Sequence, residues 1–283
     1  FTLSLQKFDI HLYEGTNNIK DYSSQFLVTD GYEMEEAKVS LNKIYTHGFY
    51  RLYQASYDED EMGSVLAINS DPIGIPITYC GYFLLFISLI WILIDKKGGY
   101  RKLLKRSWQQ FRNLLIVVFS LVGIGFIYLI YHFSHIDFSD GEHAPILNSP
   151  YFCVHVSVIM MSYVLLMLTC ISGIMGICWR SRRERMQDLS RLFLYPALTT
   201  MGLGIFIGAI WANVSWGTYW SWDSKETWAL ITFMIYAVVV HTQSLPVFRK
   251  PLIYHIYISL AFLSIAMTYF GVNFFLTGMH SYA

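Results

Sequence analysis

Tryptophan is concentrated in one stretch of this chain, WANVSWGTYWSWDSKETW, which we call the tryptophan loop (residues 211–228). The loop holds five of the eight tryptophans in the sequence: Trp211, Trp216, Trp220, Trp222 and Trp228. One carboxylate, that of Asp223, lies among them. Indole rings offer broad apolar faces, so several of them around one polar group predict a flat aromatic platform. Such a platform suits a large planar ligand.

Histidine supplies the second kind of chemistry in this sequence. His155 lies about one turn inside the third apolar segment, and His280 lies just past the last one. If both lie at the membrane face that holds the tryptophan loop, their neutral imidazoles can be the two axial ligands of a haem iron. His241 lies about 21 Å along the predicted fifth helix, counted from Thr227 at about 1.5 Å per residue. An ionisable group inside a membrane span indicates a functional site.

Ordinary structural roles also explain several of these residues. A single histidine near a helix end is usually interfacial or hydrogen-bonded, and His241 can simply mark the end of its span. Trp211 and Trp228 fit the belt of tryptophans found at membrane interfaces. A belt does not require the density of the other three: Trp216, Trp220 and Trp222.

The spacing of Asp223 and Glu226 predicts an acidic capping box that opens the following helix. That role explains Asp223 without any ligand. It is compatible with a ligand role, because a helix N-terminus also offers free N–H groups to an anion such as a propionate. Both interpretations of Asp223 therefore stay open at this point.

The composition is that of a membrane protein. Hydrophobic residues make up 54% of the chain and charged residues 14%, against about 25% charged residues in a typical soluble domain. The net charge is zero, which gives no electrostatic basis for binding nucleic acid. None of the four cysteines forms a CxxC pair, so neither a zinc site nor a redox dithiol is indicated.

Six apolar segments have roughly the ~20 residues needed to cross a bilayer. They are approximately residues 75–95, 113–133, 151–179, 192–214, 227–244 and 253–277. Lysine and arginine gather in the connections 96–112, 180–191 and 245–252, which the positive-inside rule places in the cytoplasm. The other parts then face outward: residues 1–74, the 134–150 loop, the connection 215–226 within the tryptophan loop, and the C-terminus.

Residues 1–74 alternate between apolar and polar side chains and are broken by Gly, Asn and Asp. This period of two predicts a small β-rich domain outside the membrane. The expected fold is therefore a polytopic α-helical membrane protein with about six transmembrane helices and an N-terminal β-rich extracytoplasmic domain. The chain opens at Phe1 in the middle of such an alternation, and we expect it to be part of a longer polypeptide.

Several motifs resemble those of one known family. The segment WGTYWSWDSKETWAL resembles the "WWD" signature of haem-handling membrane proteins. Its continuation KETWALITFMIYAVVVH and the terminal MTYFGVNFFLTGMHSYA are similar to the CcsA branch of the cytochrome c biogenesis proteins. Residues 48–63, GFYRLYQASYDEDEMG, resemble the end of the extracytoplasmic domain of CcsB, also called ResB. The resemblance covers nearly the whole chain and indicates the fused CcsBA form of the system II family.

The resemblance implies three domains. Residues 1–74 would be the C-terminal part of a CcsB-like extracytoplasmic domain. Residues 75–112 would be the last CcsB-like transmembrane helix and a cytoplasmic linker. Residues 113–283 would be the CcsA-like haem-handling membrane domain, which contains the WWD loop at 211–228.

The resemblance also implies roles for individual residues. His155 and His280 match the two external histidines that ligate the haem iron, and His241 matches a membrane histidine thought to guide haem from the cytoplasmic side. Five residues match the WWD loop that holds the haem: Trp216, Gly217, Trp220, Trp222 and Asp223.

The chain departs from the family pattern in three places. Ser224 replaces the usual proline after the WWD aspartate. The second membrane histidine of the family and some spans that usually precede the His155 helix are not found. The two absences lead us to expect that segments of the native chain are missing from this sequence.

The implied function is that of a cytochrome c synthase in the bacterial inner membrane. It would relay haem b to the outer face and attach it to the CxxCH motif of reduced apocytochrome c, with separate factors that keep the thiols reduced. The soluble domain, the WWD loop and the C-terminus would face the periplasm. No catalytic group of its own is identifiable. The alternatives are a haem transporter or chaperone without ligation activity, a structural membrane module, and an electron-transfer subunit.

Overall fold

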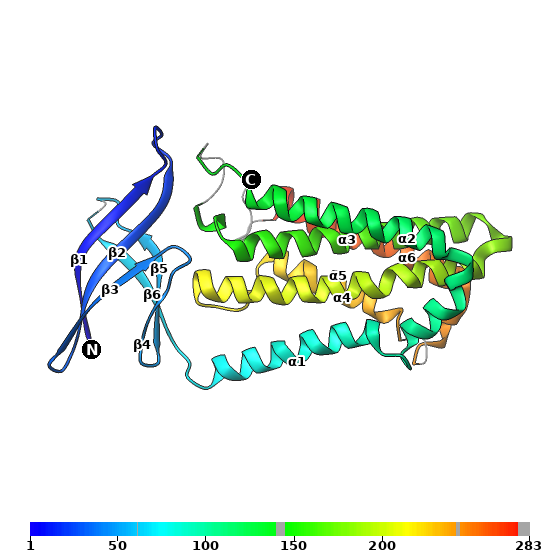
Figure 1. Cartoon of the computed structure of the whole chain (residues 1–283), viewed down its shortest axis with the longest axis horizontal. Helices are drawn as coiled ribbons and strands as arrows, with labels where there is room; N and C mark the ends of the chain where they lie inside the picture. Colours follow the sequence, from blue (N-terminus) through cyan, green and yellow to red (C-terminus); the bar gives the residue numbers. More distant parts are fainter. Residues whose placement is uncertain (61, 140–144, 242–243, 277–283) are drawn as a thin grey trace. The chain divides into compact units, whose positions relative to one another are not determined.

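The computed structural model describes residues 1–60, 62–139, 145–241 and 244–276. The chain is mostly helical, with two small sheets near its N-terminus (Figure 1). It divides into two compact units. The first contains Phe1–Cys80, His135–Phe152 and Gly208–Ser221, and the second contains Gly81–Ser134, Cys153–Ile207 and the chain from Trp222 onward.

Six strands of the first unit form two antiparallel three-stranded sheets. The first sheet has the order β1 (Thr2–Leu12), β2 (Ile19–Asp30), β3 (Glu33–Ser40), and the second has the order β4 (Tyr45–His47), β5 (Tyr50–Tyr57), β6 (Ser64–Ser70). Alternating side chains of both sheets meet in one small core, where Phe26, Val39 and Leu52 are buried. The β-rich N-terminal region predicted from the period of two is confirmed.

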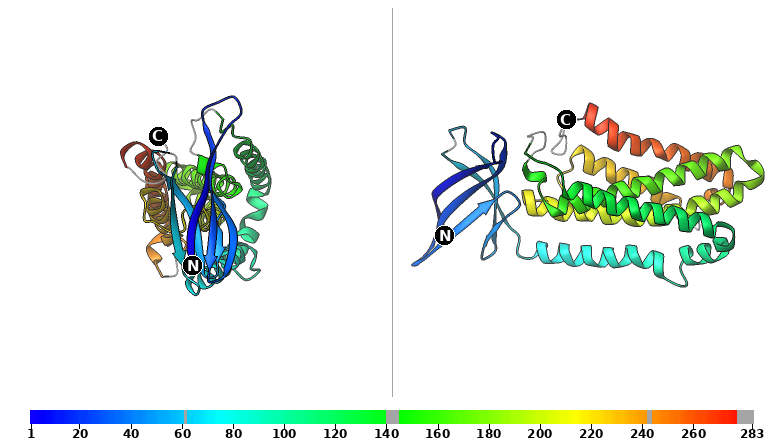
Figure 2. Two further views of the ribbon diagram at one scale, coloured as in Figure 1. Left: turned by 90° about the vertical axis from the view of Figure 1, so that its left-hand side faces the viewer. Right: turned by 45° about the horizontal axis from the view of Figure 1, so that its top comes forward.

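Seven helices lie in the described part of the chain. They are α1 (Gly74–Ile94), α2 (Gly99–Ser134), α3 (Pro150–Cys178), α4 (Arg183–Trp216), α5 (Ser224–Val238), α6 (Pro251–Ala266) and α7 (Val272–Phe275). Short 3-10 turns precede three of them, at Pro145–Leu147, Arg180–Arg182 and Pro246–Arg249, and a π-helical turn, Met267–Gly271, joins α6 to α7. In the second unit, α2 to α6 run side by side as a bundle (Figures 1 and 2).

Within the described residues, four segments are long and apolar enough to cross a membrane. They are Gly74–Ser134, Pro150–Cys178, Arg180–Trp216 and Pro251–Phe275. The prediction of six spans is not confirmed. The predicted spans 75–95 and 113–133 fall in the first segment, which contains both α1 and α2. The predicted span 227–244 corresponds to α5, whose 15 residues extend only about 22 Å, less than the ~30 Å of a hydrocarbon core.

Two connections that the sequence pattern assigned to loops are largely helical. Most of 96–112 forms the first turns of α2, and most of 180–191 forms the first turns of α4. Arginine, lysine, leucine and glutamine, which fill these stretches, are good helix formers. Positive charge therefore marks the first turns of long helices here as well as the short connections before them.

Buried aromatic and aliphatic side chains hold the bundle of the second unit together. Tyr236 of α5, Tyr254 of α6 and Leu194 of α4 are fully buried in one cluster. His255 is also fully buried, because Gly176 of α3 leaves room for its ring: a Cβ at Gly176 would lie 2.3 Å from it. The His255 Nε2–H donates to the Arg183 carbonyl at 2.9 Å, so this histidine joins α3, α4 and α6.

Candidate functional site

The tryptophan loop begins in the last turns of α4 and ends in α5. Helix α4 ends at Trp216, and Gly217 follows with a φ of +78°. The Gly217 N–H donates to the carbonyl of Asn213 at 3.1 Å. Glycine is the residue that most readily takes the left-handed conformation at a helix end, so the sequence WGT stops α4 at this point.

Strands β5 and β6 of the first unit hold the end of α4 and the Gly217 turn. The Asn69 side-chain amide donates to the Gly217 carbonyl at 2.8 Å. A Cβ at Gly217 would lie 2.9 Å from the ring of Tyr53, which is itself buried. The Arg51 guanidinium donates to the side chain of Asn213 at 3.2 Å. The β-rich region therefore contacts the tryptophan loop through specific polar and aromatic side chains.

Arg51 lies among tyrosine hydroxyl groups of the first unit. Burial lowers the pKa of Arg51, but the hydroxyls of Tyr53, Tyr79 and Tyr219 more than compensate, so that its pKa lies above the ordinary arginine value. Arg51 is therefore a permanent cation. Its hydrogen bond to Asn213 has a charged donor, and such bonds are stronger than neutral ones.

Trp211 is a core residue of the first unit and not part of an interfacial belt. It is 1% exposed, and its ring lies 5.5 Å from that of Phe152 and 5.0 Å from that of Trp216, centroid to centroid. Trp216 and Trp220 are half-buried in the same unit. Trp211 thus packs against the ring of Trp216. Because a belt residue would face the lipid, the belt interpretation of this buried Trp211 is wrong.

Trp222 and Asp223 belong to the second unit. Trp222 is 72% exposed and has a φ of +58°, which is rare for a bulky residue. Strained, exposed residues of this kind are frequent at ligand sites. Asp223 is the N-cap of α5: its Oδ1 accepts from the Glu226 N–H at 2.9 Å, and Glu226 accepts from the Asp223 N–H at 3.4 Å. The predicted capping box is confirmed.

His155 lies in the first turns of α3, where a contact with α4 orients its ring. Its Nδ1 lies 2.8 Å from the carbonyl oxygen of Gly204, and since a carbonyl only accepts, Nδ1 must be the donor. Gly204 makes this approach possible, because a Cβ there would lie 2.6 Å from Ile159 of α3. In the neutral ring the lone pair is then on Nε2. Histidines that bind metals usually have their other ring nitrogen held in this way.

The sequence pattern predicted that His241 lies inside the fifth helix, but the structure places it outside any helix. Helix α5 ends at Val238, and His241 is exposed beyond it, with its Nδ1–H donating to the Ala237 carbonyl at 2.8 Å. The alternative that His241 marks the end of its span agrees better with this geometry. His280 lies outside the described residues, and its predicted role as a haem ligand stays a prediction.

The predicted site residues are divided between the two units. Trp216, Gly217 and Trp220 belong to the first unit, whereas His155, Trp222, Asp223 and His241 belong to the second.

Sequence reasoning missed the residues that hold this site in place. Asn69 comes from a strand without any recognisable motif, and Gly204 is one of many glycines in α-helical segments. The segment GFYRLYQASYDEDEMG, which contains Arg51 and Tyr53, was a signal of family resemblance but not of contact. Their partners lie far away in the sequence, and such pairs cannot be found from local patterns.

Comparison with known proteins gives the family. A family model described as cytochrome c assembly protein matches residues 82–280. Protein NrfI of Wolinella succinogenes is 34% identical over 203 residues, which cover 65% of this chain and 22% of NrfI. The cytochrome c biogenesis protein CcsA of Pyropia yezoensis is 49% identical over 90 residues, which cover 31% of this chain and 26% of that protein.

A second CcsA, from Guillardia theta, is 33% identical over 171 residues, which cover 49% of this chain and 56% of that protein. The chain thus spans less than two thirds of the length of each of these relatives. The family model, in contrast, covers most of the chain, including α3, α4, α5 and the tryptophan loop. The chain belongs to the cytochrome c assembly protein family.

Proposed function

We propose that this protein delivers haem b to the outer face of the bacterial inner membrane and attaches it to reduced apocytochrome c. Membership of the cytochrome c assembly family supports a role in cytochrome c maturation. The observation that carries the finer proposal is the orientation of His155. Its Nδ1–H donates to the Gly204 carbonyl at 2.8 Å, and histidines that bind a metal through Nε2 are usually oriented by such a hydrogen bond.

The other predicted site residues have separate proposed roles. His280 would be the second axial ligand of the haem iron. The indole rings of Trp216, Trp220 and Trp222 would contact the porphyrin. Gly217 and Asp223 would shape the loop around the haem, and N–H groups at the start of α5 would approach a propionate. The exposed ring of Trp222, held with a φ of +58°, supports a contact with a planar ligand. His241, exposed at the end of α5, would contact haem transiently on its way from the cytoplasmic side.

The attachment reaction needs little chemistry from the protein itself. Each cysteine S–H of the apocytochrome CxxCH motif adds across a haem vinyl group: a C–S bond forms, the C=C bond becomes single, and the proton ends on the other vinyl carbon. This addition has no net redox change, but it requires the thiols to be reduced, so separate thiol-reducing factors are proposed partners. The protein contributes iron ligation and positioning of the two reactants.

Coexpression with an apocytochrome c tests this function. The host should be a bacterium without cytochrome c assembly genes, and covalent haem is measured by haem staining after denaturing electrophoresis. Covalent haem that requires only this protein supports the synthase. Haem bound to this protein without covalent cytochrome indicates a transporter or chaperone. A colourless protein indicates a structural module, and redox cycling with a quinol indicates an electron-transfer subunit; each of these three results contradicts the proposal.

A further inference from the structure

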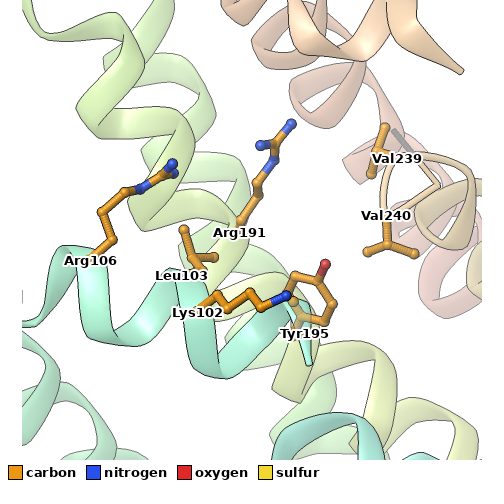
Figure 3. A pocket seen from close by; sticks show the side chains of 8 residues that line it. Lys102, Leu103, Arg106, Arg191, Tyr195, Val239 and Val240 are labelled. Atoms are coloured by element: carbon orange, nitrogen blue, oxygen red, sulfur yellow. The ribbon is translucent and has the colours of Figure 1, made fainter. Parts of the chain in front are cut away.

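One cavity of the second unit combines positive charge with apolar walls, and none of the site residues above lines it. Its volume is about 340 Å³. Helix α2 contributes Lys102, Leu103 and Arg106, helix α4 contributes Arg191 and Tyr195, and the residues just after α5 contribute Val239 and Val240 (Figure 3). The cavity thus lies between the basic first turns of α2 and α4 and the C-terminal end of α5.

The three cations of the cavity differ in how far they are already neutralised. Arg106 forms an ion pair with Asp188 of α4. Arg191 donates to the Phe248 carbonyl at 3.2 Å and lies over the ring of Tyr254, 5.0 Å from its centroid, so it is held in place but keeps its charge. Within the described part of the chain, the ammonium group of Lys102 has neither a carboxylate partner nor a hydrogen-bond acceptor.

The cavity therefore favours an anion. No carboxylate is among its lining residues in the described chain, and Lys102 and Arg191 together leave two positive charges without a counter-ion. Leu103, Val239 and Val240 add an apolar wall. A ligand that matches the positive charge and the apolar wall has an anionic group joined to a hydrocarbon group. Basic pockets between membrane helices bind lipid headgroups for this reason.

We propose that this cavity binds the phosphate of an anionic phospholipid, with Lys102 and Arg191 as its main contacts. The apolar wall favours a lipid over free inorganic phosphate. The volume lies near the lower end of the ~300–1,000 Å³ range of small-molecule sites, which favours a compact headgroup over a porphyrin. This site is separate from haem ligation and does not depend on it.

Native mass spectrometry of the detergent-purified full chain tests the proposal. The probes are dioleoylphosphatidylglycerol, which is anionic, and dioleoylphosphatidylcholine, which has no net charge. We expect phosphatidylglycerol to bind the wild type more tightly, and Lys102→Gln to weaken its binding about fivefold, the loss expected for one lysine contact. Lys105→Gln is the matched control, because Lys105 is exposed on the same helix but does not line the cavity.

The competing ligands give the results that would overturn the proposal. Displacement of phosphatidylglycerol by millimolar inorganic phosphate would assign the site to free phosphate, and displacement by stoichiometric haem would assign it to haem carboxylates. Equal binding of the two lipids, or equal losses in Lys102→Gln and Lys105→Gln, would also contradict it. Thermal unfolding of both variants shows whether they are folded, and Lys102→Arg, which keeps the charge, should restore binding.

Discussion

Asp223 caps helix α5, and this structural role can be separated from the ligand role that we propose for it. Its Oδ1 accepts the Glu226 N–H at 2.9 Å, which requires an oxygen acceptor but not a negative charge. A proposed role of Asp223 in holding haem through its negative charge would, in contrast, depend on that charge. Asparagine keeps the acceptor and loses the charge, so substitution can separate the two roles.

We predict that Asp223→Ala lowers the free energy of unfolding by about 1 kcal/mol, the usual value of an N-cap. Asp223→Asn should be nearly as stable as the wild type, because asparagine is an equally good cap. Thermal unfolding in detergent measures both. An alanine variant as stable as the wild type would rule out a capping contribution. A stable asparagine variant that loses bound haem would show that the charge itself matters for the ligand.

Gly217 is the second residue of the loop whose position restricts the residue type, because it has a positive φ and lies close to Tyr53. We predict that Gly217→Ala destabilises the protein more than Gly48→Ala does. Both glycines have positive φ, +78° and +56°, but a Cβ at Gly217 would meet the Tyr53 ring at 2.9 Å, whereas Gly48 has open space. The shared φ cost is about 1 kcal/mol, and the added overlap costs about 1–3 kcal/mol. Equal unfolding temperatures of the two variants would contradict the Tyr53 contact.

The sequence predicts the structural role of a residue well where its hydrogen-bond partners lie close to it in the chain. The spacing of Asp223 and Glu226 was sufficient for the capping box, since both hydrogen bonds lie within one helical turn. The contacts of His155 with Gly204 and of Asn69 with Gly217 join residues 49 and 148 positions apart. No local pattern encodes such pairs, because they depend on how helices and strands pack.

At the scale of elements, helix α5 shows why hydropathy overestimates membrane spans. The apolar run continues through Val238 and Val240, so the pattern predicted a span to residue 244. The helix ends at Val238 instead, where a run of β-branched valines lowers helix propensity. The His241 ring then donates to the Ala237 carbonyl, one of the last acceptors of the helix. Apolar composition alone contains no information on where the backbone hydrogen bonds stop.

The packing of α3 on α4 is the element-scale feature that orients His155. We predict that Gly204→Ala lowers both stability and haem content, because its methyl group would lie 2.6 Å from Ile159 and push the helices apart. Gly123→Ala in α2 is the control, since nothing lies within 4 Å of its Cβ position. Alanine is favoured over glycine in a helix by up to about 1 kcal/mol, so the control should be neutral or stabilising.

Thermal unfolding and the haem-to-protein ratio of the two variants check this prediction. A Gly204→Ala protein with wild-type stability and full haem content would mean that the close approach of α3 and α4 is unimportant. The comparison also separates a loss caused by packing at this crossing from a general effect of adding a methyl group to a membrane helix.

At the scale of the whole molecule, the tryptophan loop is divided between the two units. The chain up to Ser221 belongs with the β-rich region, and the chain from Trp222 belongs with the helices. The alternating pattern of residues 1–74 and the long apolar runs were sufficient to predict a β-rich part and a helical part. The contact of β5 and β6 with the Gly217 turn was not predicted, although it gives the β-rich region a structural role in positioning the loop.

His132 offers a control for His155, because both lie at the same end of the helices of the second unit. Its ring stacks on Tyr128 of the same helix, with centroids 6.0 Å apart. The nearby Ile130 carbonyl accepts from the Cys153 thiol at 3.3 Å, so the end of α2 lies beside the start of α3. Loss of His132 therefore removes an imidazole from this end of the bundle without touching the His155–Gly204 hydrogen bond.

The visible absorption spectrum of the purified full chain, with His155→Gly and His132→Ala beside it, tests haem ligation most directly. We predict that the wild type and His132→Ala retain haem with the same spectrum. His155→Gly should lose most of the haem or change its spectrum, and added imidazole should restore the wild-type bands by filling the vacated position. A His155→Gly protein with unchanged haem content and an unchanged spectrum would contradict ligation by His155, and with it the central claim about this site.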